Sequence, residues 1–308
     1  MNIVVLASAE RGLRCLKSLT KVMSSDDELT VFTFPETEWE PKYVARIEDF
    51  SNSINASFHV TTKVHDEQYN AFWKNNVDII LVIGWRYLIP ESVYNNAKLG
   101  CFVFHDSLLP EYRGFGPSVW SIRNGENHTG ASLFKISKNI DDGPILDQVR
   151  VEIGPTEYIG DVVEKVTVCY EEMIAKNYKL LRSGDVFLKE QSHNQATYTC
   201  KNMPIDFEID WNQSSADIYN LIRAYSSPYP GAFTTLNGKK LTILKASIVK
   251  IQNYIGIIPG RVLEFDINGN VTVLCGRGAL KLERIIYESE EISPVKLVVS
   301  SIGDTLGK

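Results

Sequence analysis

The chain has 308 residues, of which 44% are hydrophobic and 23% are charged, and its formal net charge is -6 at pH 7. This composition is that of a globular protein, and the acidic balance disfavours nucleic acid as a partner. No apolar run approaches the ~20 residues of a membrane helix, and the chain opens directly into Ile3–Leu6 without a basic leader, so we expect a cytoplasmic protein with no membrane partner.

Short apolar runs alternate with helical patterns in the first half of the chain. The runs that predict strands are residues 3–6, 29–34, 58–60, 77–83 and 101–104. The patterns that predict helices are residues 11–22, 39–50, 66–75 and 90–97. This alternation predicts an α/β fold with an open, mostly parallel, Rossmann-like sheet that is covered on both faces. Its crossover connections are expected to be right-handed.

The sheet is expected to end in an antiparallel pair, followed by a long helix. After a helix at residues 117–125, apolar residues 131–136 and 145–153 predict two antiparallel strands. Residues 157–181 carry apolar side chains on one side and predict an amphipathic helix, which Gly184 ends. We therefore expect one domain over residues 1–184.

The pattern changes in the last third of the chain. Residues 185–205 are polar and irregular and are interpreted as a linker, and a helix is expected at 214–225 with Ser214 or Ser215 as its N-cap. The runs that predict strands are residues 241–244, 260–265, 271–274 and 280–286. Asn237-Gly238 and Asn268-Gly269 are hairpin signals, so residues 206–308 are expected to form a smaller domain with a β-barrel.

Metal and dinucleotide chemistry are disfavoured. The five cysteines are scattered, with no Cys-x-x-Cys pair, and the histidines have no metal-ligand spacing. Residues 6–12 follow the first strand but lack the Gly-x-Gly-x-x-Gly pattern of a dinucleotide site. We expect neither a bound metal nor a disulfide framework.

The ends of two predicted strands carry a histidine and a carboxylate. His105 directly follows residues 101–104 and begins a loop rich in Ser, Pro, Arg and Gly, while Asp141 and Asp142 follow residues 131–136. Because ligands of open α/β sheets bind outside the carboxyl ends of the strands, these groups are candidates for a general-base pair. Alone, Asp141-Asp142-Gly143 is also a common turn sequence.

This arrangement resembles the folate-dependent formyltransferases, which include methionyl-tRNA, glycinamide ribonucleotide and sugar N-formyltransferases. The order and spacing match over about forty positions. The matching residues are His105, Ser107, Leu108, Leu109, Pro110, Tyr112, Arg113, Gly114, Pro117, Trp120, Gly125, Thr129, Gly130, Asp141, Asp142 and Gly143.

The resemblance implies a reaction, a formyl donor and a set of site residues. His105 would be the base that takes a proton from an amine, and Asp141, two residues before Gly143, would orient it. The donor would be N10-formyltetrahydrofolate, and the C-terminal domain an OB-like barrel. Donor-binding positions would be Trp85, Arg86, Tyr87, Leu88, Leu109, Arg113, Gly114 and Ile140. Acceptor-binding positions would be Arg223, Tyr225 and Tyr229.

One position departs from the family pattern. The family has Asn two residues before the histidine, where it helps to hold the oxyanion of the transition state, and this chain has Val103. An oxyanion donor typically contributes ~3–4 kcal/mol of transition-state stabilisation. Protonated His105 or a backbone N–H is a candidate replacement. The departure also keeps open a formyltetrahydrofolate hydrolase or a non-catalytic binding protein.

Two acceptors are consistent with the resemblance. The tRNA enzymes carry a basic loop after the second strand, whereas the corresponding residues Pro35–Pro41 are acidic here. Residues 205–308 carry eleven Lys plus Arg and eleven Asp plus Glu, so they are neutral. RNA affinity depends on basic groups meeting phosphates, so a nucleotide-linked amino sugar is favoured over methionyl-tRNA. The sequence leaves a homodimer open.

Overall fold

The computed structural model describes the chain apart from residues 39, 76, 288–289, 293 and 295–301. The described chain forms two compact units. The first consists of Met1–Pro117, His128–Glu152 and Val163–Cys200. The second consists of Ser118–Asn127, Ile153–Val162 and Lys201–Lys308. No helix among the described residues is long and apolar enough to cross a membrane.

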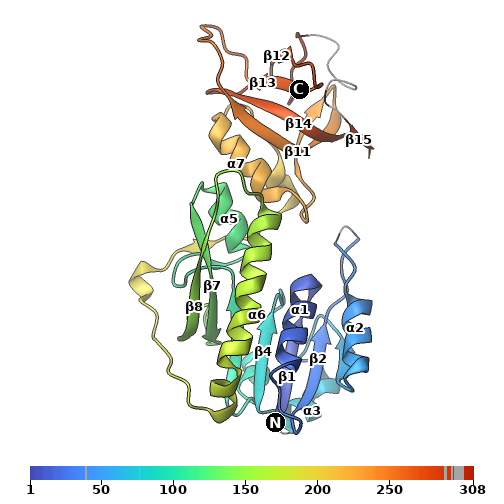
Figure 1. The fold of residues 1–308 in the computed structure, drawn as a ribbon, viewed down its shortest axis with the longest axis vertical. Coiled ribbons are helices and arrows are strands. Elements are labelled where there is room, and N and C mark those ends of the chain that lie inside the picture. Colours follow the sequence, from blue (N-terminus) through green and yellow to red (C-terminus); the bar gives the residue numbers. More distant parts are fainter. Residues whose placement is uncertain (39, 76, 288–289, 293, 295–301) are drawn as a thin grey trace. The chain divides into compact units, whose positions relative to one another are not determined.

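The first unit is built on a seven-stranded sheet with the order β3-β2-β1-β4-β5-β7-β8 (Figure 1). Strands β1 to β5 pair in parallel, and β7 and β8 add an antiparallel edge, so the predicted mixed sheet is confirmed. The strands are β1 (Asn2–Ala7), β2 (Glu28–Thr33), β3 (Ser57–Val60), β4 (Ile79–Ile83), β5 (Gly100–His105), β7 (His128–Lys135) and β8 (Ile145–Glu152).

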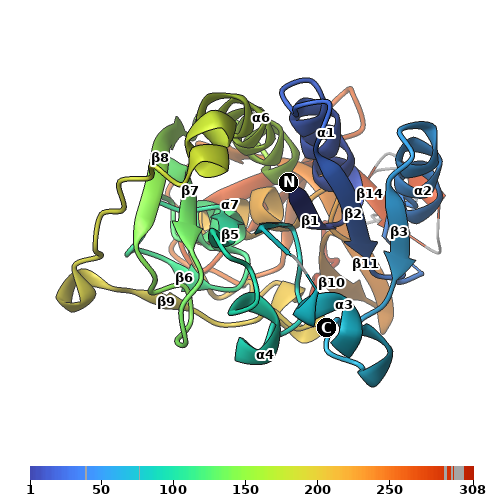
Figure 2. The ribbon, with the colours of Figure 1, turned by 90° about the horizontal axis from the view of Figure 1, so that it is seen from below.

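Helices cover both faces of this sheet, as the alternation predicted. Figure 2 looks along the layers, with α1 and α6 on one side of the sheet and α3 and α4 on the other. The helices are α1 (Ala9–Thr20), α2 (Val44–Ser53), α3 (Asn70–Lys74), α4 (Glu91–Tyr94) and α6 (Ile159–Ser183), with the 3₁₀ turn η1 (Glu67–Tyr69) before α3. Trp73 of α3 and Val93 of α4 pack on Val4, Leu6 and Val82 of the sheet.

Three helices are shorter or later than the sequence suggested. The helix expected from residue 39 begins at Val44, because Glu36 accepts the N–H groups of Tyr43 and Val44 and so satisfies donors of its first turn. Residue 39 itself lies outside the described residues. The region expected to be one helix over residues 66–75 is η1 followed by one turn of α3, and that expected over 90–97 is the single turn α4.

The second unit combines helices with an antiparallel sheet. The helices are α5 (Pro117–Arg123), η3 (Pro204–Phe207) and α7 (Ser215–Tyr225). The strands are β10 (Ala232–Leu236), β11 (Lys239–Val249), β12 (Val262–Phe265), β13 (Val271–Leu274), β14 (Ala279–Tyr287) and β15 (Glu290–Ile292). Their order is β10-β11-β14-β13-β12, with β15 on β14. Closure of this sheet into an OB-like barrel stays a prediction.

Two local signals in the second unit are confirmed. Asn237 and Gly238 both have positive φ and connect β10 to β11 through a two-residue turn, as an Asn-Gly hairpin requires. The hydroxyl of Ser214 accepts a 3.2 Å hydrogen bond from the N–H of Asp217, so Ser214 is the N-cap of α7.

Residues 185–200, interpreted from the sequence as part of a linker, belong to the first unit. They contain the 3₁₀ turn η2 (His193–Gln195) and β9 (Tyr198–Thr199), which pairs in parallel with β6 (Arg113–Gly114). Lys189 and Ile145 exchange two backbone hydrogen bonds of 2.8 Å. This stretch is therefore a hydrogen-bonded part of the unit that carries His105.

Candidate active site

His105 is the last residue of β5, and its buried side chain lies between a carbonyl and a carboxylate. Its Nε2 is 2.8 Å from the carbonyl oxygen of Tyr112, and its Nδ1 is 3.6 Å from Oδ2 of Asp141. Because a carbonyl only accepts hydrogen bonds, Nε2 must carry the proton in this arrangement. In the neutral ring, Nδ1 is therefore the basic nitrogen, and it is the one that faces Asp141.

Asp141 is fixed by the main chain around it. It lies in the loop after β7 with a φ of 47°, and its Oδ2 accepts a 2.8 Å hydrogen bond from the N–H of Gly114. Two residues later, a Cβ on Gly143 would lie 1.8 Å from the carbonyl oxygen of Lys135, so only glycine fits there. The loop that carries Asp141 is thus held by the main chain at two points, the N–H of Gly114 and the carbonyl of Lys135.

The neighbouring carboxylate points elsewhere. Asp142 accepts hydrogen bonds from the hydroxyl of Ser137 and, at 2.7 Å, from the amide of Asn139. Burial opposes its ionisation, but these hydrogen bonds hold the pKa of Asp142 below its ordinary value. Asp142 therefore closes its own turn, whereas Asp141 faces the histidine, and the role of Asp141 in orienting His105 stays a prediction.

A largely buried ion pair anchors the residue that follows His105. Oδ1 of Asp106 is 2.6 Å from Nη1 of Arg11 and also accepts the hydroxyl of Tyr170. Although burial alone would raise the pKa of the Asp106 carboxyl, the Arg11 charge and the Tyr170 hydrogen bond lower it below its ordinary value. The backbone carbonyl of Asp106 accepts from Thr129 of β7 at 2.7 Å. Helix α1, helix α6 and β7 thus all hold the first residue of the loop.

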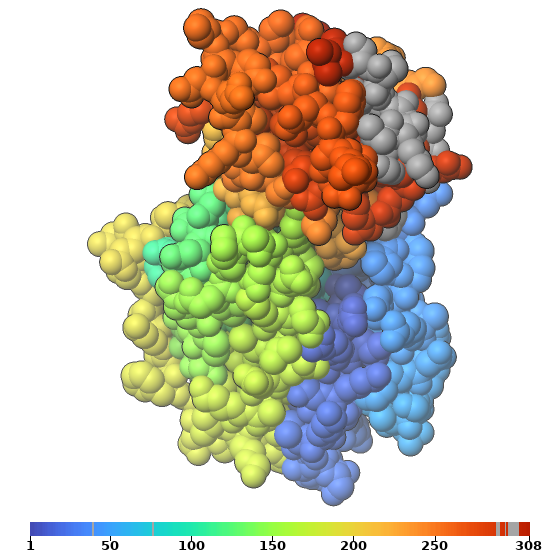
Figure 3. Space-filling view, turned by 45° about the horizontal axis from the view of Figure 1, so that its top comes forward, coloured from blue at the N-terminus to red at the C-terminus, as the bar shows by residue number. Residues whose placement is uncertain are grey.

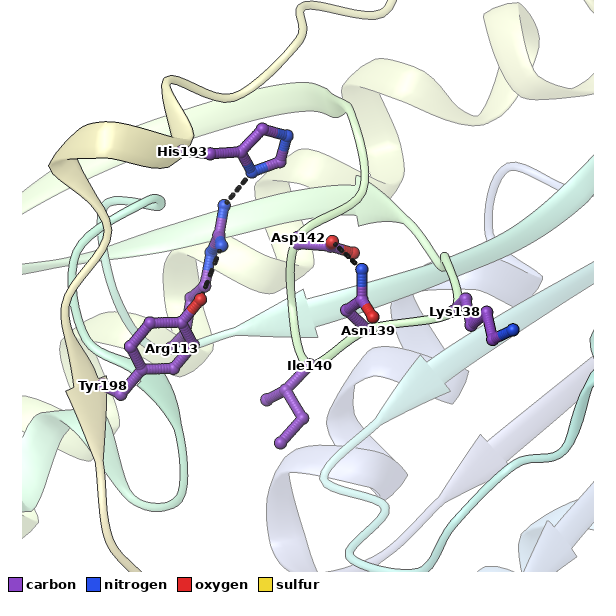
Figure 4. A pocket seen from close by; sticks show the side chains of 7 residues that line it. All are labelled: Arg113, Lys138, Asn139, Ile140, Asp142, His193 and Tyr198. Carbon is purple, nitrogen blue, oxygen red and sulfur yellow. Dashed lines mark hydrogen bonds between the residues drawn. The ribbon is translucent and has the colours of Figure 1, made fainter.

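Arg113, predicted to bind the donor, is an internal cation with a relative exposure of 1%. Its Nη2 donates to Oε1 of Gln191 at 2.6 Å and lies 3.1 Å from Nδ1 of His193, and its Nη1 donates to the hydroxyl of Tyr198 at 3.1 Å. Figure 4 shows the guanidinium between His193 and Tyr198. These hydrogen bonds fix the guanidinium at the edge of a depression that Arg113 helps to line, and its contact with the donor stays a prediction.

An open depression of about 680 Å³ lies beside this cation. Figure 4 shows Asn139 and Asp142 on one of its sides and His193 and Tyr198 on another. Its remaining lining residues are Arg113, Lys138 and Ile140. The depression thus mixes cationic, anionic and hydrogen-bonding groups next to the loop that carries Asp141.

Four of the residues predicted to bind the donor, Trp85, Arg86, Tyr87 and Leu88, lie in a second loop, after β4. Trp85, Tyr87 and Phe34 pack edge to face, with ring centroids 5.1–5.9 Å apart. The indole nitrogen of Trp85 is buried and has no hydrogen-bond partner among the residues that the structure describes. The guanidinium of Arg86 lies 4.5 Å from the centre of the Phe34 ring and pairs with Glu40. These side chains form a largely aromatic wall.

Two apolar residues of the predicted donor site are unusually exposed. Leu88 has a relative exposure of 81% and Ile140 one of 61%. Leu109, by contrast, is buried in a small cluster with Phe134 and Ile145. The first two can contact a ligand directly, while Leu109 supports the loop from inside.

Val103 offers no hydrogen-bond donor to this site. It lies on β5 two residues before His105 and packs, partly buried, against the cluster of Leu109, Phe134 and Ile145. Both ring nitrogens of His105 face acceptors, the carbonyl of Tyr112 and the carboxylate of Asp141. A protonated His105 can therefore donate to an oxyanion only by giving up one of these contacts, and the 3.6 Å approach to Asp141 is the weaker.

The residues predicted to bind the acceptor lie in the second unit. Arg223 is buried in α7, where it donates to the carbonyls of Gly154 and Glu157. Tyr225 is also buried, and its hydroxyl donates to Asn202 and accepts from Arg123. Tyr229 lies after α7 and is half-buried. The structure therefore gives Arg223 and Tyr225 packing roles, and a role of the three in acceptor binding stays a prediction.

Several residues of the site were not indicated by any sequence pattern. Gln191 and His193 lie in a polar stretch whose composition gives no periodic signal, and the Arg11–Asp106 pair joins positions 95 residues apart. No sequence pattern showed that Arg113 is buried, and it is this burial that requires acceptors from elsewhere in the chain.

Comparison with known proteins supports the same family over most of the chain. The family model described as "Formyl transferase" matches residues 1–176, and that described as "Formyl transferase, C-terminal domain" matches residues 202–301. Residues 177–201 lie between these two matches.

Three solved structures with a similar fold illustrate the range of relatives. An N-formyltransferase from Helicobacter canadensis, solved with folinic acid and dTDP-3-aminofucose, is 18% identical over 91% of this chain and 98% of its own, with a TM-score of 0.68. HypX from Aquifex aeolicus is 17% identical with a TM-score of 0.64 over 98% of this chain, which spans 49% of the HypX chain. Methionyl-tRNA formyltransferase from Clostridium thermocellum is 22% identical over 84% of this chain and all of its own, with a TM-score of 0.56. Because the family models cover both units, the chain belongs to the formyl transferase family.

Proposed function

We propose that this protein transfers a formyl group from N10-formyltetrahydrofolate to the primary amine of a nucleotide-linked amino sugar. The observation that carries the proposal is the pairing of His105, at the carboxyl end of β5, with Asp141, in the loop after β7, in a member of the formyl transferase family. Both groups lie on rigid elements, His105 at the end of a strand and Asp141 in a loop fixed by Gly114. A general base held in this way is suited to proton transfer.

In the proposed reaction the amine nitrogen attacks the formyl carbon, a new C–N bond forms, and the bond from that carbon to N10 breaks. Nδ1 of His105 accepts the proton that the amine loses, and Asp141 stabilises the resulting imidazolium. The same proton then returns to the departing N10. The products are the formamide and tetrahydrofolate, and His105 ends the cycle neutral.

The donor fits the wall described after β4. A pterin is flat and carries both apolar faces and hydrogen-bonding edges, and such groups bind in pockets of aromatic and aliphatic side chains with a few polar contacts. Leu88 and Ile140 are exposed apolar side chains, and Trp85 belongs to the aromatic cluster with Phe34 and Tyr87. Similar structures have been solved with folinic acid or tetrahydrofolic acid.

The choice of a sugar over tRNA rests on charge. The segment Pro35–Pro41 carries three glutamates, and two of them already have local partners, since Glu36 binds the start of α2 and Glu40 pairs with Arg86. An acidic segment repels a phosphate backbone. A similar structure contains dTDP-3-aminofucose, which supports a nucleotide-linked amino sugar as the acceptor class.

The test is a comparison of acceptors with purified protein and N10-formyltetrahydrofolate. We expect turnover with at least one of a panel of UDP-, dTDP-, GDP- and CMP-linked amino sugars and none with methionyl-tRNA. His105→Ala protein serves as the control for uncatalysed transfer. Formylation of methionyl-tRNA alone would overturn the acceptor, and formate release that no amine accelerates would favour the hydrolase that Val103 leaves open.

A further inference from the structure

Residues 185–200 form part of the site although neither family model covers them. In Figure 3 this stretch, drawn in yellow, runs over the surface of the first unit beside the green residues of β7 and β8. Its backbone is bonded at both ends, by Lys189 to Ile145 and by β9 to β6. Between these points the buried side chain of Gln191 turns inward.

Gln191 connects the buried cation to the loop of Asp141. Its Oε1 accepts hydrogen bonds from Nη2 and Nε of Arg113, at 2.6 Å and 3.1 Å. Its Nε2 donates to the carbonyl oxygens of Asp141, at 2.9 Å, and of Gly143, at 2.6 Å. One amide group thus makes four hydrogen bonds, which is all that its oxygen and nitrogen can offer.

The chemistry of these four contacts requires an amide. Among the residues that the structure describes, no carboxylate lies within ion-pair distance of Arg113, so the amide oxygen is its main acceptor. The two carbonyls on the other side need N–H donors, which a carboxylate cannot supply. Because a buried polar group that loses its partner carries a desolvation cost, neither the guanidinium nor the two carbonyls can be left without the amide.

The carbonyls that Gln191 holds flank the catalytic carboxylate in the chain. Fixing the carbonyl oxygens of Asp141 and Gly143 fixes the left-handed backbone of Asp141, whose φ is 47°. The side chain of Asp141 then meets the N–H of Gly114 and faces Nδ1 of His105. A displacement of about 1 Å in such a group can lower the rate of an enzyme by about 100-fold.

We propose that Gln191 is a positioning residue for catalysis. Its amide N–H groups set the direction of the Asp141 carboxylate toward His105, and its amide oxygen accepts the hydrogen bonds of the buried Arg113. The inference rests on the proposed function of His105 and Asp141. The proposal gives residues 185–200, which lie between the two family matches, a role in catalysis.

The first variant is Gln191→Glu, which keeps the size of the side chain and the acceptor for Arg113 but removes both N–H donors. We expect kcat to fall about 10- to 100-fold, while the KM values for donor and acceptor stay within about threefold of wild type. Gln191→Met removes all four hydrogen bonds and should lower kcat at least as much. Gln195→Ala, an exposed glutamine four residues later, is the matched control and should leave kcat unchanged.

A double-mutant cycle with Asp141→Asn separates positioning from a general effect on folding. If Gln191 acts through Asp141, then Gln191→Glu should lower kcat no further once Asp141 is already replaced. A full additional loss in the double variant would overturn the proposal. So would Gln191→Glu protein with wild-type kcat.

A measurement without acceptor distinguishes this proposal from the proposed function. In protein with ¹⁵N-labelled histidine, the ring nitrogen signals of His105 report its contact with Asp141. Gln191→Glu and Asp141→Asn should both change these signals, and Gln195→Ala should not. Unchanged His105 signals in Gln191→Glu protein would overturn the positioning role. If no acceptor is formylated but the His105 signals change in the variants as predicted, the result would instead count against the proposed function alone.

Discussion

The main-chain N–H of Gly114 donates a 2.8 Å hydrogen bond to Oδ2 of Asp141, the same oxygen that lies 3.6 Å from Nδ1 of His105. The carboxylate is therefore aimed by the backbone of a neighbouring loop. Because Gly114 has a φ of 106° and a Cβ there would lie 2.6 Å from the carbonyl oxygen of Thr199, the close approach requires glycine. The orientation of the carboxylate that faces the proposed base is thus set by the backbone of the fold.

Replacing His105 by alanine should remove the proposed base. General-base catalysis typically contributes about 10²- to 10⁴-fold, so we expect kcat to fall by that range while donor binding is retained. Steady-state kinetics and donor titration measure the two quantities. His65→Ala, at an exposed histidine, is the control. Near wild-type turnover of His105→Ala protein would remove His105 from the mechanism.

Asp106 should make the fold sensitive to acid. Because its folded-state pKa is lowered below the ordinary ~3.9 of an aspartate, its contribution to stability is complete above that pH and is lost as the pH falls through the folded-state pKa. Asp106→Asn should cost about 3 kcal/mol of unfolding free energy at pH 7 and flatten the dependence on pH below 4. Urea unfolding at pH 3 to 7 measures both.

The control for that experiment is Asp185→Asn, at an exposed carboxylate after α6. It should leave both the unfolding free energy at pH 7 and its dependence on pH as in wild type. Equal acid sensitivity of Asp106→Asn and wild-type protein would mean that other carboxylates dominate acid unfolding.

Gly143 should tolerate no side chain. A Cβ at this position would lie 1.8 Å from the carbonyl oxygen of Lys135, so the loop that carries Asp141 must move. We expect Gly143→Ala to lower both the melting temperature and kcat, with a stability cost of about 1–3 kcal/mol. Gly256→Ala, where nothing lies within 4 Å of the added Cβ, should do neither. Calorimetry measures the melting temperatures of both variants, and steady-state kinetics measures their kcat values. Equal values for the two variants would contradict the prediction.

Val103→Asn should introduce an oxyanion donor at a packed position. We expect a higher kcat, because a new N–H donor beside His105 can stabilise the transition state, together with a lower melting temperature, because the amide replaces apolar contacts with Leu109 and Phe134. Val103→Ala removes the packing without adding a donor and isolates that effect. An unchanged kcat in folded Val103→Asn protein would mean that another group already holds the oxyanion.

Much of the fold follows from patterns that act over short distances. The alternation that predicted a parallel sheet depends on apolar runs such as Ile79–Ile83, which are buried on both faces. The Asn237-Gly238 turn and the Ser214 cap are likewise local, because each is fixed by backbone geometry within a few residues. The helix at Val44 began late because the side chain of Glu36, eight residues away, bonds its first turn.

The site could be predicted only in part, because several of its contacts join residues that lie far apart in the sequence. His105 and Asp141 follow apolar runs and carry a recognisable motif, so their positions were open to sequence reasoning. Gln191 occupies a polar stretch that has no periodicity, and its importance depends on a buried Arg113 that lies 78 residues earlier. Nothing in the local sequence of Arg113 shows that its guanidinium is buried, and its contact with the donor stays a prediction.

The inward turn of Gln191 also bears on how the protein can be divided. A fragment cut at residue 176, where the first family match ends, would retain His105, Asp141 and Arg113 but would lose the amide that joins them. Its guanidinium would be left in the interior without its main acceptor. A chimaera that takes its catalytic portion from this chain should therefore extend through Cys200, so that β9 and Gln191 come from the same parent as the loop they hold.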